Sequence, residues 1–195
     1  MKTFARSAIF LAVCLAATHA FAQSAAAPSA AKPAPPKPAA PSVSSEPEST
    51  TASFGDWTLR CTRVTGLSSK GKLCEIVQAI TIQGQSGPIA QIAIGRVNAE
   101  EPLKLTAQLP NNVTFPSTVH FAVEEKETLS ADLSWKRCLP GGCYADVDVK
   151  DEQIAKWRPQ ADKGRLTFKD ATGREIQLPF SFKGLSQALD ALEKA

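Results

Sequence analysis

The sequence predicts a mainly β fold, most simply an antiparallel β-sandwich with one short helix and one C-terminal helix. Apolar side chains alternate with polar ones over short segments, which is the period of a strand with one buried face. Turn-rich stretches separate these segments, as in domains built from many short antiparallel strands. Two further segments have the spacing of amphipathic helices instead.

The alternating segments begin at Phe54, and in the first of them Trp57, Leu59 and Cys61 share a face. Later segments place further apolar residues on one face: Ile76, Ile80 and Ile82; Ile89, Ile92 and Ile94; Leu103, Leu105, Ala107 and Leu109; Val119, Phe121 and Val123; Leu129, Ala131, Leu133 and Trp135; Ala145, Val147 and Val149; Leu166 and Phe168; and Ile176, Leu178, Phe180 and Phe182. Among the large aromatic side chains, we expect Trp57, Trp135, Phe180 and Phe182 in the core.

Two helices are expected near the C-terminus. Asp151 is placed to cap a short helix that carries Ile154, Ala155 and Trp157 and ends before Pro159. A second helix should dock on the sandwich through one apolar face, formed by Leu185, Ala188, Leu189 and Leu192.

Residues 1–22 have the pattern of a secretory signal peptide. Lys2 and Arg6 precede an apolar run over 8–17, and an A-x-A pattern predicts cleavage before Gln23. The run is shorter than the ~20 residues that span a bilayer, and no later segment approaches that length. We therefore expect an exported protein without a transmembrane segment after cleavage. Its expected location is the periplasm, with outer-membrane association or secretion as alternatives.

Residues 23–53 predict a disordered linker, and residues 54–195 predict one folded domain. The linker consists mainly of Ala, Pro, Ser and Thr, so it has little apolar surface to bury. Removal of the signal peptide reduces the 22 basic residues to 20, against 19 acidic ones. A nearly neutral chain without clustered Lys and Arg argues against nucleic-acid binding.

Four cysteines fall in the domain, and in an exported protein an even number indicates disulfides. Cys61 and Cys74 flank one turn-like stretch, and Cys138 and Cys143 flank another. Opposed residues of an antiparallel hairpin have a Cα separation that suits a disulfide, which favours the pairs 61–74 and 138–143. A crossed pairing between sheets, such as 74–138, is the alternative.

The sequence predicts no enzyme, cofactor or metal site. The gap between Cys138 and Cys143 is wider than the C-x-x-C of thiol oxidoreductases, and the spacing of 61 and 74 is wide for a zinc knuckle. His120 is the one histidine after signal cleavage; a Ser–His–Asp arrangement through it stays open, although no G-x-S-x-G is present. The carboxylates most suggestive of acid/base pairs or calcium ligands are expected to be solvated strand residues and a helix cap: Glu124, Glu125, Asp146, Asp148 and Asp151.

Four motifs, in this order, resemble the invasion-associated locus B family: FGDWTLRC (54–61), CEIVQ (74–78), CLPGGC (138–143) and LPFSFKGLSQALDAL (178–192). The resemblance covers about residues 53–193. Leu185 stands where the family usually has Phe, and LPNNVTFPSTV (109–119) replaces a glycine-bearing turn and a leucine strand. The resemblance implies an exported, immunoglobulin-like β-sandwich with no established catalytic activity, linked to the envelope and to bacterial entry into host cells.

These observations lead to two functional hypotheses. The first is a non-enzymatic, exported binding or structural module of the cell envelope, whose exposed strand faces and loops contact an unknown envelope component or host protein. The alternative is a periplasmic thiol-redox or disulfide-handling protein that works through Cys138 and Cys143.

Overall fold

The computed structural model describes residues 47–64, 71–96, 98, 100–123, 126–161 and 163–195. The predicted signal peptide, and the predicted linker up to residue 46, lie outside the described residues. For residues 1–46 they stay predictions.

Antiparallel pairing joins the described strands into one ten-stranded sheet, in the order β1-β2-β3-β4-β5-β8-β7-β6-β9-β10. Their bounds are β1 Ser49–Phe54, β2 Trp57–Arg63, β3 Lys72–Thr81, β4 Pro88–Gly95, β5 Leu103–Leu109, β6 Thr118–Val123, β7 Lys126–Leu139, β8 Gly142–Val149, β9 Lys163–Lys169 and β10 Glu175–Ser181. With the two helices described below, this confirms the predicted mainly antiparallel β fold.

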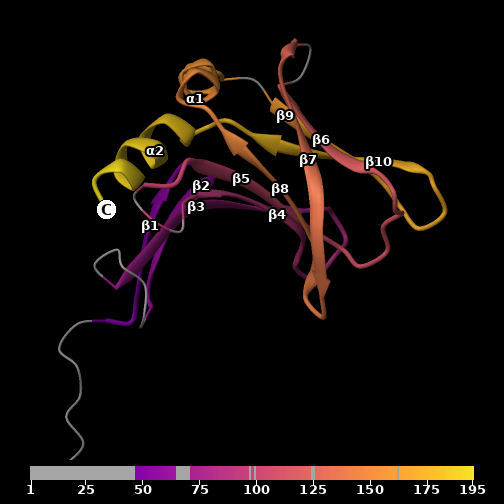
Figure 1. The fold of residues 1–195 in the computed structure, drawn as a ribbon, viewed down its shortest axis with the longest axis horizontal. Coiled ribbons are helices and arrows are strands. Elements are labelled where there is room, and N and C mark those ends of the chain that lie inside the picture. The colour runs from indigo at the N-terminus through magenta and orange to yellow at the C-terminus, as the bar shows by residue number, and fades with distance from the viewer. Residues whose placement is uncertain (1–46, 65–70, 97, 99, 124–125, 162) are drawn as a thin grey trace, which may run out of the picture. The chain divides into compact units, whose positions relative to one another are not determined.

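The sheet folds over its own apolar face, so that β10 contacts β3 although nearly the whole strand order separates them (Figure 1). The predicted alternation accounts for this face: along β5, for example, buried and half-buried residues alternate without exception. Both halves of the sheet contribute to one core cluster. Phe121 stacks on Phe180 at 4.6 Å between ring centroids, and Phe182 lies 5.1 Å from Phe180. The two layers of the fold are thus parts of one hydrogen-bonded sheet.

Most of the aromatic core residues are placed as the sequence predicts. Trp57 is fully buried, and Phe180 and Phe182 are buried too. Trp135 differs, because it is only half-buried against the core. It lies opposite the buried Ala145 and therefore faces the core as predicted, but at the margin, where its ring meets the exposed Phe115.

Two helices cover one end of the sheet (Figure 1). Helix α1 spans Asp151–Trp157 and buries Ile154 and Trp157. Its N-cap is Lys150, so the prediction that Asp151 caps it is wrong by one residue; Asp151 lies in the first turn, where its charge suits the helix dipole. Helix α2 spans Leu185–Glu193 and contacts β1, β2 and β3, with Leu192 at the margin of its buried face.

Strand β1 occupies the last residues of the predicted linker. Ser49–Phe54 pair in register with Trp57–Thr62 of β2, although the side chains of 49–53 are exposed. The linker prediction is wrong for these residues, because backbone hydrogen bonds hold the strand and do not require apolar residues at alternate positions.

Candidate functional site

The motifs FGDW, CEIVQ and SFKG meet at one junction between β2, β3 and the end of β10. Trp57 Nε1 donates to the Ser181 carbonyl at 2.9 Å, and Gln78 Nε2 donates to the same oxygen at 3.0 Å. Gln78 Oε1 accepts from the Ser181 N–H at 2.8 Å, and the Asp56 N–H donates to the Lys183 carbonyl at 3.0 Å. Side-chain bonds thus connect strands from the two ends of the strand order.

Two glycines permit this close approach. Gly55 and Gly184 have φ values of 58° and 89°, in the region that favours glycine. A Cβ at Gly55 would lie 2.7 Å from the Lys183 carbonyl oxygen, and one at Gly184 would overlap the Phe54 carbonyl. Because the two backbones touch at these glycines and the polar groups around them are hydrogen-bonded, the junction closes the fold.

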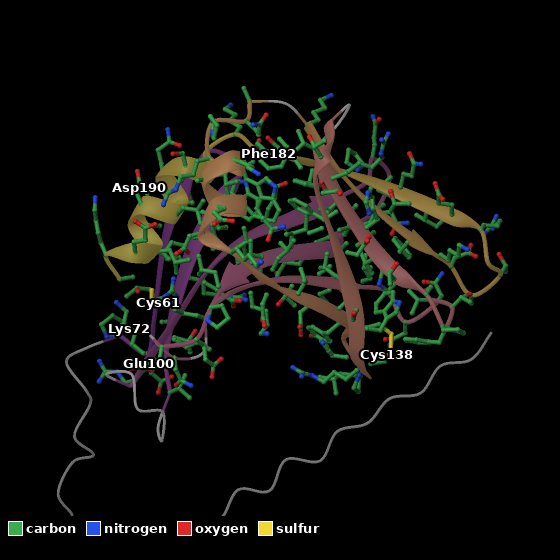
Figure 2. All side chains as sticks on the ribbon, turned by 45° about the horizontal axis from the view of Figure 1, so that its top comes forward. Cys61, Lys72, Glu100, Cys138, Phe182 and Asp190 are labelled. Atoms are coloured by element: carbon green, nitrogen blue, oxygen red, sulfur yellow. A yellow bond between two sulfur atoms is a disulfide. The ribbon has the colours of Figure 1, made fainter. Side chains whose placement is uncertain are left out.

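Both cysteine pairs lie in hairpins, as the strand spacing predicts. Cys61 bonds Cys74 across β2 and β3, with Cα atoms 4.0 Å apart, and Cys138 bonds Cys143 across β7 and β8, at 3.9 Å. Figure 2 shows Cys61 and Cys138 on opposite sides of the domain. Both residues of the second pair belong to strands, away from any helix N-terminus that would stabilise a thiolate. This arrangement is typical of a structural staple.

His120 pairs with a carboxylate on the outer face of the sheet. Its Nδ1 lies 2.7 Å from Asp132 Oδ1, on the neighbouring strand β7. The side chains are 35% and 69% exposed, so water screens the pair. In a Ser–His–Asp triad the carboxylate is buried and orients the imidazole. The open position of Asp132 therefore gives the triad hypothesis no support.

The carboxylates of β8 take part in cross-strand ion pairs. Lys104 Nζ contacts Asp148 and lies 3.8 Å from Asp146, while Lys136 Nζ lies 3.6 Å from Asp146. The hydrogen bond to Asp148 raises the pKa of Lys104. Residues 124 and 125 lie outside the described residues. Within the described ranges, no group of three or more His, Cys, Asp or Glu is arranged to hold a metal ion.

Asp170 is a buried carboxylate that the sequence did not single out. Its oxygens accept from the Thr172 hydroxyl at 2.6 Å, from the Arg174 Nε at 3.0 Å and from two backbone N–H groups of the β9–β10 turn. The Thr172 hydroxyl and these other donors lower the pKa of Asp170 to about 2. The DATGR sequence carries the signal, because Asp commonly bonds the backbone two residues ahead in turns. This carboxylate stabilises a turn.

An apolar surface lies where the β5–β6 loop meets the β7–β8 hairpin. We call it the tip surface and define it by Phe115, Pro116, Trp135, Leu139 and Pro140. Phe115 and Leu139 are 56% and 47% exposed, and they are two of the three large apolar side chains exposed among the described residues. The Phe115 and Trp135 rings meet edge to face at 5.5 Å. Alternation along the strands did not predict this surface, because Phe115, Pro116 and Pro140 lie outside the strands.

The tip surface is held by polar contacts beneath it. Trp135 Nε1 donates to Ser117 Oγ at 3.0 Å, and Gln108 Nε2 donates to the Gly141 carbonyl at 2.8 Å. Asn111 Nδ2 donates to the Pro140 carbonyl at 3.4 Å, and the 138–143 disulfide closes the hairpin. These contacts join the β5–β6 loop to the β7–β8 hairpin.

The model of the invasion associated locus B protein family matches residues 57–193. The chain belongs to this family. A crystal structure of invasion associated protein B from Bartonella henselae is similar in fold: the TM-score is 0.61 and the identity 18%, over 74% of this chain and 96% of that one. No curated protein matches the chain.

The family match runs from β2 to α2. It includes Trp57, Gln78 and Ser181 of the junction, both disulfides and the tip surface, whereas β1 and residues 55–56 precede it. The motifs by which the chain resembles the invasion-associated locus B family are therefore mainly those that close and staple the fold. Among the described residues, no helix has the length and hydropathy needed to span a membrane.

Proposed function

We propose that this member of the invasion-associated locus B family is an exported, non-enzymatic binding module of the bacterial cell envelope, and that the tip surface is its contact. The family description, which names an association with invasion, supports a role at the cell surface or in the envelope. One observation carries the choice of surface: Phe115 and Leu139 are exposed apolar side chains on a loop and a hairpin that hydrogen bonds join to each other. Exposed apolar groups held in place mark interaction sites.

Site-specific photo-crosslinking in intact cells tests this proposal. A photoreactive amino acid replaces Leu139 at the tip surface, and in a control chain it replaces Ala79, an exposed residue of β3. We expect a crosslinked partner, either protein or lipid, from position 139 and little from position 79. Equal labelling at the two positions, or none at position 139, would remove the support for a binding module that uses this surface.

A count of free thiols distinguishes the thiol-redox alternative from the binding module. A structural 138–143 disulfide should give no free thiol in the native protein and resist reduction at the glutathione potential. A readily reduced Cys138–Cys143 pair would favour the thiol-redox function instead.

A further inference from the structure

The tip surface combines apolar side chains with positive charge. Its two segments, residues 108–118 and 134–144, contain Lys136 and Arg137 and no acidic residue, although Asp146, just beyond them, lies 3.6 Å from Lys136 Nζ. The Arg137 guanidinium lies 5.5 Å from the centroid of the Tyr144 ring, which holds it beside the hairpin. The surface is therefore complementary to an anionic partner.

Two neighbouring turns add a further cation and a further exposed apolar side chain. Lys169 is exposed, and its carbonyl accepts the Thr114 N–H at 3.1 Å, so β9 ends beside the β5–β6 loop. The register also brings the β3–β4 turn to this end of the strands, where Ile82 is 42% exposed. Residues 82–87 carry no charge. Of the two carboxylates at the β9–β10 turn, Asp170 is buried, and Glu175 is exposed opposite Lys169.

Phe115 projects from the β5–β6 loop and Leu139 from the tip of the β7–β8 hairpin. Three hollows formed by described residues lie elsewhere, two beside Arg96 and Pro102 and one between Arg158 and Lys183. A peptide partner usually needs a groove or a free strand edge to bind. Apolar and aromatic groups on projecting loops, flanked by cations, instead suit the headgroup and acyl boundary of a bilayer.

We propose that the tip surface binds the surface of an anionic phospholipid bilayer. Phe115 and Leu139 enter the acyl boundary, Trp135 lies at the level of the headgroups, and Lys136 and Arg137 contact lipid phosphates. This inference rests on the proposed function, because it names the partner of the same surface. Contact by two apolar side chains and a few cations gives reversible association.

Tryptophan fluorescence gives a direct readout. Trp57 and Trp157 are buried, with their Nε1 atoms bonded to the Ser181 and Leu129 carbonyls, whereas Trp135 is half-buried. Phosphatidylcholine vesicles that contain phosphatidylglycerol should shift the emission to the blue and sediment the full chain. Vesicles of phosphatidylcholine alone should do neither. High salt should weaken the binding, because it screens the contacts with phosphate.

Substitutions then assign the contact to the tip surface. Leu139→Ser should weaken vesicle binding about fivefold, from the half-exposed apolar area that it removes. Arg137→Gln should also weaken it about fivefold, from one lost cation near the surface. Lys72→Gln is the matched control: Lys72 is exposed beside Cys61, on the opposite side from Cys138 (Figure 2), and its loss should change binding less than about twofold. Circular dichroism checks that each variant is folded.

The outcomes separate this inference from the proposed function. Failure to bind phosphatidylglycerol vesicles, or equal losses from Arg137→Gln and Lys72→Gln, would overturn the bilayer as the partner. If position 139 still crosslinks to a protein in intact cells, the proposed binding function stands and its partner is a protein. If neither vesicles nor crosslinks report contact, both proposals fail.

Discussion

Trp57→Ala should lower the free energy of unfolding by about 3–5 kcal/mol. The side chain is fully buried at the junction, and its removal leaves a cavity that the surrounding strands can fill only in part. The lost hydrogen bond adds little, because the Ser181 carbonyl keeps its second donor, Gln78 Nε2, at 3.0 Å. Since a domain of this size has a stability of about 5–15 kcal/mol, the variant should fold but melt roughly 10–20 °C lower.

Urea unfolding followed by far-UV circular dichroism measures this loss. Trp135→Ala is the matched control, because it deletes the same side chain from a half-buried position and should cost about 1–2 kcal/mol. An unchanged midpoint for Trp57→Ala, or equal costs for the two variants, would refute the role of Trp57 in closing the core.

Three further changes test the polar contacts and the staples. Gln78→Leu should cost about 1–3 kcal/mol in urea unfolding, because it leaves the Ser181 N–H without its partner; an unchanged midpoint would contradict this. Replacing both Cys138 and Cys143 with Ser should lower the free energy of unfolding by about 2 kcal/mol. Peptide mapping of the native protein should find Cys138 joined to Cys143 and neither of them joined to Cys61 or Cys74. The lowered pKa of Asp170 stabilises the folded state above the ordinary value of 3.8, and this contribution is lost as the pH falls toward about 2. Asp170→Asn should therefore reduce the pH dependence of the melting temperature in that window, and an unaltered dependence would show that another group titrates.

Local patterns in the sequence were sufficient for much of the fold. Alternation placed Leu105 and Phe121 on the buried face, because a strand repeats every two residues whatever its partner is. The 61–74 and 138–143 pairings could be predicted for a similar reason. Each joins the two strands of one hairpin, so chain spacing alone puts the cysteines opposite one another.

Features that depend on contacts between residues far apart in the chain could not be predicted from the sequence. Gln78 reads as an ordinary strand residue until Ser181, 103 positions later, is placed beside it. The side chains of residues 49–53 are exposed and rich in hydroxyl groups, so they show no apolar alternation. The strand there is defined by backbone pairing and could not be predicted. The tip surface was not predicted either, because the contact between Phe115 and Trp135 joins the β5–β6 loop to strand β7.

The junction also affects the order in which the chain can fold. Its bonds span 103 residues from Gln78 and 124 from Trp57, so both halves must be present before the sheet can close. Pairings between residues so distant in sequence form slowly, since the chain entropy is lost before the contacts are gained. A nascent chain that ends before Ser181 lacks the acceptor for Trp57 and one wall of the core. Such a chain lacks its closing strand until β10, Glu175–Ser181, has been synthesised.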